Sequence, residues 1–232
     1  MIVSTHPARL AAMLAPLRPD LIICCGFPYR LSPDVTSLPR FGAINVHPAL
    51  LPRHRGPWPL HWTFRAGDTE AGMTVHWMDA AFDTGGILAQ GSVPVTDEDD
   101  GASLMMKLAP LAVGLLVDAL PRIANGDPGI PQDEALATEA GFFEDAWRVV
   151  NWDQPARIVH NQIRSWTGVT GTPRGAFATL DDARVLVTRT RLGSAGTTGG
   201  HLPGTVLHRN EGSLVVQCSD GPIEILEWAP AM

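Results

Sequence analysis

The stretch that decides the fold covers residues 41–57 and reads FGAINVHPALLPRHRGP. In it an apolar run leads to Asn45, Val46 and His47, and the chain then meets Pro48. Successive side chains of an extended strand point to opposite faces, so Asn45 and His47 share a face. An amide and an imidazole side by side, where a buried strand opens into a loop, predict a functional site. The alternative is a polar pair satisfied by backbone groups, as is common at strand ends.

Length and composition indicate a soluble globular protein with room for two modest domains. The chain has 232 residues, of which 45% are hydrophobic and 18% charged, and its net charge is −7. An acidic chain without a basic stripe disfavours a large nucleic-acid partner. The sequence shows no signal peptide, no apolar run long enough for a bilayer and no metal-ligand spacing of its three cysteines. We therefore expect a cytoplasmic protein without a membrane contact or a metal.

Short apolar runs separated by turns predict a parallel sheet. Residues 21–25 form a continuous apolar run, typical of a strand buried on both faces, and residues 43–46 form the next strand. A helical pattern at residues 7–18 precedes them. Strand, crossover and strand of this kind indicate parallel pairing, with ligands beyond the carboxyl ends of the strands. Gly26 and His47 both lie at such ends.

A third polar residue follows the next predicted strand, at residues 72–78. Asp83 lies in the glycine-rich loop DAAFDTGG, where its carboxylate could reach the imidazole of His47. Together with Asn45, these groups suit acyl transfer without a covalent intermediate. The amide or imidazolium would stabilise a developing oxyanion, and the carboxylate would orient the imidazole. The alternative for Asp83 is an ordinary turn cap.

The chain divides into three predicted parts. Residues 1–125 form the core with the polar trio, including an antiparallel or edge strand at 87–95 and a long helix at 102–124. Residues 126–141 are rich in glycine, proline and acids, and indicate a linker. Residues 142–232 begin with a helix near 155–164 and continue in short β-like runs, which predict a small β-rich, barrel-like domain.

Two long motifs resemble the formyltransferases that use 10-formyltetrahydrofolate. They are INVHPALLPRHRGPWPLHW at residues 44–62 and GMTVHWMDAAFDTGGILAQ at residues 72–90, and their separation agrees as well. The family includes methionyl-tRNA, glycinamide ribonucleotide and nucleotide-linked amino-sugar enzymes. The resemblance implies an α/β fold, with a partial Rossmann-like parallel sheet before the β-rich domain. It also implies that Asn45, His47 and Asp83 are catalytic.

The donor site is implied by the same resemblance. The stretch DLIICCGFPYRLSP at residues 20–33 is similar to the family segment that grips the pterin, and the loop at 79–83 would close the other side. Backbone groups beside an aromatic ring suit a flat, amide-like ligand. Packing of the turn by its aromatic residues is the alternative. The implied cofactor-binding residues are Gly26, Phe27, Tyr29, Leu31, Asp79, Ala81 and Phe82.

The family resemblance does not by itself identify the molecule that accepts the formyl group. The segment after residue 142 resembles the carboxyl-terminal domain of the tRNA and amino-sugar enzymes. Because tRNA binding should require a basic face and the chain is acidic, we expect an amine acceptor, with a nucleotide-linked amino sugar favoured over tRNA. The alternatives are a methionyl-tRNA formyltransferase-like enzyme, a formyltetrahydrofolate hydrolase, and a truncated, non-catalytic folate-binding relative.

Three departures from the family pattern stand out. Ala49 replaces the family serine, and Gly86 follows Asp-Thr-Gly where Asp or Pro is frequent. The family also has about two further βα units before the equivalent of residues 21–25. Three explanations are open: the start of the chain is misplaced, a homodimer or another partner covers the missing half of the sheet, or the chain is a reduced and inactive relative.

Overall fold

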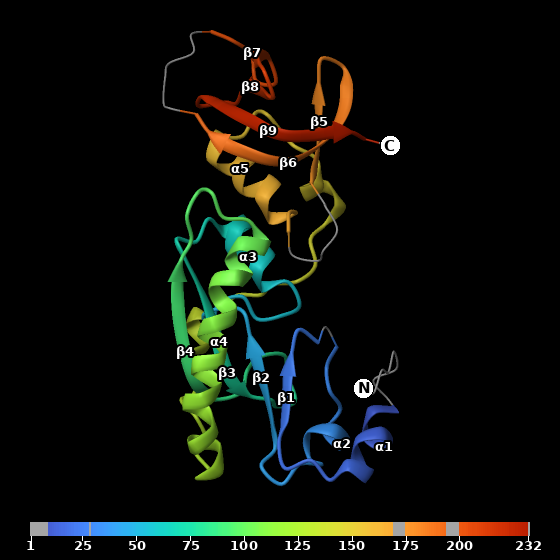
Figure 1. The fold of residues 1–232 in the computed structure, drawn as a ribbon, viewed down its shortest axis with the longest axis vertical. Coiled ribbons are helices and arrows are strands. Elements are labelled where there is room, and N and C mark those ends of the chain that lie inside the picture. The colour runs from blue at the N-terminus through green and yellow to red at the C-terminus, as the bar shows by residue number, and fades with distance from the viewer. Residues whose placement is uncertain (1–8, 28, 169–174, 194–199, 232) are drawn as a thin grey trace. The chain divides into compact units, whose positions relative to one another are not determined.

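The computed structural model describes residues 9–27, 29–168, 175–193 and 200–231 of the chain (Figure 1). The chain separates into two compact units that each combine several segments. The first unit comprises Met1–Pro59, Glu70–Val93 and Lys107–Gly141, and the second comprises Leu60–Thr69, Pro94–Met106 and Phe142–Met232.

The first unit is built on a four-stranded sheet with the order β1-β2-β3-β4. Its strands are β1 (Ile22–Cys25), β2 (Ala43–His47), β3 (Glu70–Trp77) and β4 (Ile87–Pro94). Its short helical segments are α1 (Leu10–Leu14), η2 (Ala15–Leu17), α2 (Pro33–Thr36) and η3 (Glu134–Leu136). The predicted α/β class is confirmed, and the edge position expected for residues 87–95 is that of β4.

β1 and β2 pair in parallel and align Ile22 with Ala43. β3 runs antiparallel to β2 and places His76 opposite Asn45. The sheet is therefore mixed rather than parallel throughout. The physical reason is that the chain leaves β2 and enters β3 at the same end of the sheet, so it does not have to cross back to the opposite end between the two strands.

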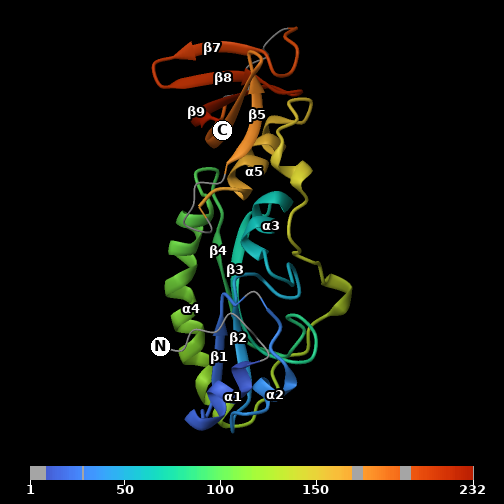
Figure 2. The same cartoon turned by 90° about the vertical axis from the view of Figure 1, so that its right-hand side faces the viewer.

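The long helix α4 (Gly101–Ala124) runs along the sheet of the first unit (Figure 2). Leu108, Ala119 and Ile123 are buried, whereas Val113 and Val117 are exposed, so burial accounts for only part of its apolar composition. Contrary to the sequence expectation, α4 is long and apolar enough to cross a membrane, with a hydropathy of 1.7. One such helix is weak evidence for a membrane span, because helices of water-soluble cores meet the same criterion.

The edge of the sheet at β1 is relevant to the expected partner. Among the residues that the structure describes, β1 pairs on one side only, with β2. Ile23 on this strand is 49% exposed. An open strand edge is a template for further pairing. Coverage of this edge by a homodimer or another partner stays a prediction.

The segment at residues 126–141, which the sequence indicates to be a linker, packs within the first unit. Isolated bridges join Ile130 to Ile87 and Glu139 to Arg55. The backbone N–H of Trp58 also donates to the carbonyl of Ala140. The segment is therefore an ordered strap along the core.

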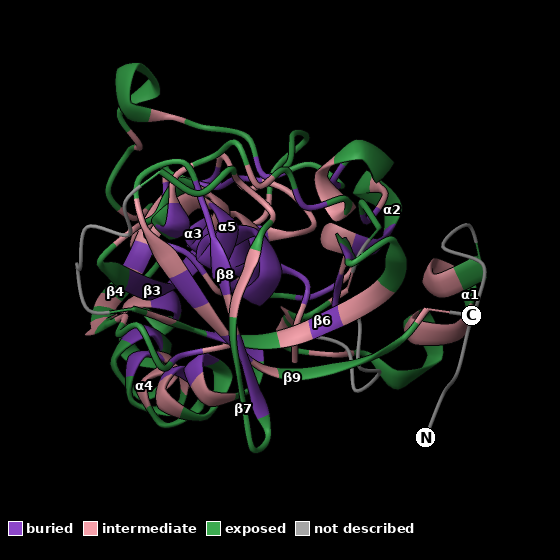
Figure 3. Cartoon of the chain, turned by 90° about the horizontal axis from the view of Figure 1, so that it is seen from above, coloured by how far each residue is buried: buried purple, intermediate pink, exposed green. Residues whose placement is uncertain are grey.

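The second unit holds a five-stranded antiparallel sheet with the order β5-β6-β9-β8-β7. Its strands are β5 (Ala176–Leu180), β6 (Ala183–Leu192), β7 (Val206–Asn210), β8 (Ser213–Gln217) and β9 (Pro222–Pro230). Its helices are α3 (Pro59–Ala66), η4 (Asp145–Arg148) and α5 (Ala156–Ser165). The β-rich domain is confirmed, and Figure 3 shows the buried residues of α5 against it.

A buried histidine joins α5 to its surroundings in this unit. The Nε2–H of His160 donates to the carbonyl of Asp97 at 2.9 Å, so its Nδ1 accepts from the hydroxyl of Thr190 at 2.8 Å. Burial lowers the pKa of His160 from its ordinary 6.5 to about 4. The native state therefore holds this imidazole neutral.

We predict that His160 makes the protein less stable in mild acid. As the pH falls below 6.5, the unfolded chain takes up a proton at this position before the native state does. The linkage should cost about 2 kcal/mol of unfolding free energy between pH 6.5 and pH 5. In urea unfolding, His160→Gln should lower stability at pH 7.5 but flatten the pH dependence. The exposed control His208→Gln should keep the wild-type slope, and equal slopes in all three proteins would contradict the prediction.

Candidate active site

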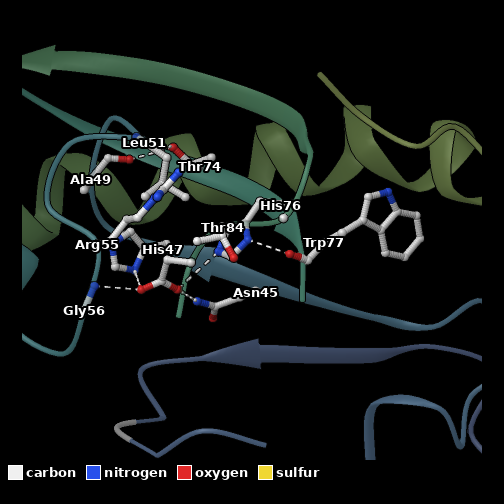
Figure 4. A network of polar contacts seen from close by, with 12 residues as sticks. Asn45, His47, Ala49, Leu51, Arg55, Gly56, Thr74, His76, Trp77 and Thr84 are labelled. Atoms are coloured by element: carbon white, nitrogen blue, oxygen red, sulfur yellow. Dashed lines mark hydrogen bonds and ion pairs between the residues drawn. The ribbon is translucent and has the colours of Figure 1, made fainter. Parts of the chain in front are cut away.

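The structure brings Asn45 and His47 (both labelled in Figure 4) together with Asp83 at the carboxyl end of β2. Asn45 and His47 point from the same face of β2, as expected from strand alternation. Asp83 comes from the loop after β3, where its backbone has a positive φ of 55°. The local turn, and not a helix or strand, therefore aims the carboxylate at β2.

The carboxylate of Asp83 accepts two hydrogen bonds. Its Oδ1 accepts from Nδ2 of Asn45 at 3.1 Å, and its Oδ2 accepts from the backbone N–H of Gly56 at 2.8 Å. Nδ1 of His47 lies 3.6 Å from Oδ2, and Nε2 of His76 lies 3.4 Å from Oδ1. Burial raises the pKa of Asp83, but the contacts with His76, His47 and Gly56 outweigh it and lower the pKa to about 2. Asp83 is therefore ionised at neutral pH.

His47 is buried and has a defined proton arrangement. Its Nε2 lies 2.8 Å from the carbonyl of His54, which can only accept, so Nε2 carries the hydrogen. Burial lowers the pKa of His47, while Asp83 opposes that shift. His47 is thus a neutral imidazole whose free lone pair is on Nδ1, the nitrogen nearer Asp83. This state is the one that a general base requires.

The strap at residues 126–141 holds the loop that carries Asp83. Nε2 of Gln132 donates to the carbonyls of Asp83 and Gly85, both at 2.8 Å. The buried guanidinium of Arg55 donates to Oε1 of Gln132 and to both carboxylate oxygens of Glu134. Gln132 thereby links the loop after β3 to the loop after β2.

A cavity adjoins the trio in the first unit. All seven residues expected to contact the donor line it, together with Cys24, Arg30 and His76. The rings of Phe27 and Tyr29 meet edge to face, with centroids 5.6 Å apart, while Tyr29 remains 56% exposed. Oδ1 of Asp79 accepts from the N–H of Ala81 and from the hydroxyl of Thr84, so Asp79 shapes the loop on the other side. The cavity is thus bounded by the two segments that the resemblance indicated.

The two local departures from the family pattern have structural counterparts. The carbonyl of Ala49 accepts a 2.6 Å hydrogen bond from the hydroxyl of Thr74, which holds the loop without the family serine. A Cβ atom at Gly86 would lie 2.2 Å from the carbonyl oxygen of Pro128. The strap therefore approaches too closely for a side chain at that position.

Sequence reasoning missed His76 and Gln132. His76 lies opposite Asn45 in the β2–β3 register, so the two side chains share a face of the sheet. The alternation of residues 72–78 placed His76 on one side of a strand but gave no pairing partner. Gln132 lies in a segment whose composition resembles that of a flexible linker. In the described ranges, no group of three His, Cys, Asp or Glu side chains is placed to hold a metal ion.

An amide, an imidazole and a carboxylate beside a cavity form a site suited to acyl-group transfer. Two family models match the chain, "Formyl transferase" at residues 3–120 and "Formyl transferase, C-terminal domain" at residues 144–232. The chain belongs to the formyl transferase family. The resemblance drawn from the two sequence motifs is thereby confirmed.

Curated relatives by sequence include methionyl-tRNA formyltransferases. The one from Pelobacter propionicus is 35% identical over 97% of this chain and 70% of its own length. The one from Citrifermentans bemidjiense is 35% identical over 91% of this chain and 64% of its own length. The chain therefore spans about two thirds of the length of these relatives.

Solved structures with the same fold come from several kinds of protein. HypX from Aquifex aeolicus in complex with tetrahydrofolic acid has a TM-score of 0.74 at 20% identity, over 98% of this chain and 38% of its own. An N-formyltransferase from Helicobacter canadensis, in complex with folinic acid and dTDP-3-aminofucose, has a TM-score of 0.64 at 19% identity, over 80% of this chain and 66% of its own. Methionyl-tRNA formyltransferase from Clostridium thermocellum has a TM-score of 0.63 at 19% identity, over 82% of this chain and 80% of its own. At these identities the likeness shows the fold alone.

We predict that Gln132→Ala loosens the loop that carries Asp83. The change leaves the carbonyls of Asp83 and Gly85 without their donor, which should cost ~1–3 kcal/mol of unfolding free energy. Amide hydrogen exchange of residues 79–86 should become faster, as mass spectrometry would show. The control Gln154→Ala removes an exposed amide and should leave both measurements unchanged. Unaltered exchange in Gln132→Ala would show that the strap does not hold the loop.

Proposed function

We propose that this protein transfers the formyl group of 10-formyltetrahydrofolate to an amine. The observation that carries the proposal is the convergence of Asn45, His47 and Asp83 beside a cavity lined by the expected donor-binding residues. Membership of the formyl transferase family supports the same reaction. The donor would supply a formyl carbon on a nitrogen that can leave once it gains a proton.

Each member of the trio has a distinct proposed role. Asn45 uses one hydrogen of Nδ2 for Asp83, which leaves the second free to donate to the oxygen of the formyl group. The neutral imidazole of His47 would accept the proton of the attacking amine and, as imidazolium, help to stabilise the oxyanion. Asp83 would stabilise that imidazolium. The proton then passes to the departing nitrogen of the donor, so the formyl group and the proton exchange places.

The donor's flat ring system would lie between residues 26–31 and the loop at 79–83. Phe27, Tyr29, Leu31 and Phe82 offer apolar surface to its faces, and the backbone of Gly26 and Ala81 offers polar groups to its edge. Tetrahydrofolic acid and folinic acid are ligands of two proteins with this fold, which supports the assignment. Asp79 would act by shaping the loop, since its Oδ1 is engaged by Ala81 and Thr84.

For the acceptor, the comparisons support methionyl-tRNA better than the amino sugar favoured on the basis of charge. The relatives at 35% identity are methionyl-tRNA formyltransferases, whereas sugar N-formyltransferases resemble the chain in fold only. Net charge is a weak guide to the acceptor, because it sums over the whole chain and does not describe the surface that an acceptor meets. We propose methionyl-tRNA as the acceptor, with an amino-sugar nucleotide as the alternative.

We predict that His47→Ala abolishes most formyl transfer without abolishing donor binding. Loss of a general base of this kind should lower kcat by ~10²–10⁴-fold. A thermal shift with a stable folate analogue should still occur, because His47 is not among the proposed donor-binding residues. The exposed control His208→Ala should keep wild-type turnover. Turnover near the wild-type rate in His47→Ala would contradict the mechanism.

We predict that the purified protein formylates initiator methionyl-tRNA when supplied with 10-formyltetrahydrofolate. Parallel reactions with a nucleotide-linked amino sugar, and without any acceptor, would identify the alternatives. Formylation of the sugar alone would overturn the proposed acceptor. Formate released at the full rate without an acceptor would indicate a hydrolase, and no thermal shift with folate would count against the donor assignment.

A further inference from the structure

A second histidine contacts the carboxylate of the trio from the opposite side. His76 lies on β3, is 1% exposed and is a residue that the proposed mechanism does not use. Its Nδ1 lies 2.7 Å from the carbonyl oxygen of Trp77, and its Nε2 lies 3.4 Å from Oδ1 of Asp83 (Figure 4). Nε2 has no hydrogen-bond partner in the part of the chain that the structure describes.

The contact with Trp77 fixes one proton of His76. A carbonyl oxygen can only accept, so Nδ1 must carry a hydrogen. In a neutral imidazole Nε2 would then present a lone pair to the carboxylate of Asp83. Two acceptors facing each other in a buried site repel. The contact is attractive only if Nε2 carries a hydrogen too, which makes His76 an imidazolium.

His47 approaches Asp83 under the same restriction. Its Nε2–H donates to the carbonyl of His54, so a neutral His47 also turns a lone pair, that of Nδ1, toward Asp83. The ring centroids of His47 and His76 are 6.2 Å apart, so two imidazolium ions would repel each other before the reaction begins. We therefore expect only one of the two rings to carry an additional proton.

His76 is better placed than His47 to carry that proton. Its nitrogen is nearer to the carboxylate, at 3.4 Å against 3.6 Å for His47. The other groups around the site do not supply the charge, because the guanidinium of Arg55 is turned to Glu134 and Gln132. Arg30 also lines the cavity, and its guanidinium donates to the carbonyl of Ala80. The remaining titratable groups nearby are Tyr29, His54, the Asp79 carboxylate and the thiol of Cys24, whose pKa burial raises to about 11.

We propose that His76 is a positioning residue that, as an imidazolium, balances the charge of Asp83 and so leaves His47 neutral as the base. This inference rests on the proposed function and deepens it. With a neutral His76, the uncompensated carboxylate would draw the proton to Nδ1 of His47 and block the nitrogen that receives the proton of the amine. His76 acts on the reaction only through Asp83.

The first test measures the protonation of the histidine ring nitrogens directly. In the full chain labelled with ¹⁵N-histidine, NMR at pH 7.5 should show both nitrogens of His76 protonated and only Nε2 of His47 protonated. In Asp83→Asn, His76 should become neutral, with its proton on Nδ1. The resonances are assigned by loss in His76→Gln, or in His76→Asn if the first variant does not fold. A neutral His76 in the wild-type protein, or an unchanged one in Asp83→Asn, would overturn the proposal.

The second test separates positioning from a packing role. The rate of formyl transfer should fall on the alkaline side as His76 loses its proton. His76→Gln should be about tenfold slower at pH 7.5 and should lack that alkaline decline. His61→Gln, at another buried histidine, should keep the wild-type profile. A profile in His76→Gln that is merely scaled down in parallel would overturn the proposal.

The two tests also keep this inference distinct from the function on which it rests. Absence of formyl transfer from the wild-type protein with every acceptor would refute the proposed function. The NMR measurement of the ring nitrogens requires no turnover, so its result would still decide whether His76 carries the proton.

Discussion

The buried carboxylate of Asp83 is the constraint on which the site depends. A charge removed from water must be compensated by donors in its surroundings. Here the donors are Nδ2 of Asn45 and the N–H of Gly56, and the imidazoles of His47 and His76 stand on either side. These groups come from two strands and a loop that are far apart in the sequence. Because all of them must reach the carboxylate of Asp83, they fix where β2, β3 and the loops that follow these strands meet.

Much of this site could be predicted from local pattern. Alternation along β2 placed Asn45 and His47 on one face, and the glycine-rich turn marked Asp83 as a residue that could turn back toward them. His76 needed information of another kind, namely that it stands opposite Asn45 in an antiparallel register. Register depends on which strands pair, and that choice is made by the whole sheet rather than by any one segment.

The same distinction explains what was incomplete in the predicted fold. Apolar runs located the strands of the first unit, but hydrophobicity carries no information on strand direction, so they do not predict that β3 is antiparallel to β2. The strap at residues 126–141 has a linker's composition, yet its glycines and prolines permit a close approach to the core. Pro128 lies against Gly86, and Gln132 reaches the loop of Asp83. Such contacts are long-range and leave no local signature.

The strap also changes what counts as the smallest working piece of this protein. A boundary drawn after α4 would look natural, because the helix ends there and the composition shifts. The backbone of the loop that carries Asp83 would then lose the amide of Gln132, and Arg55 would lose both of its partners in the strap. A fragment or a chimaera that is to retain the geometry of the site must therefore extend through Gly141, even though residues 126–141 contribute no group to the reacting centre.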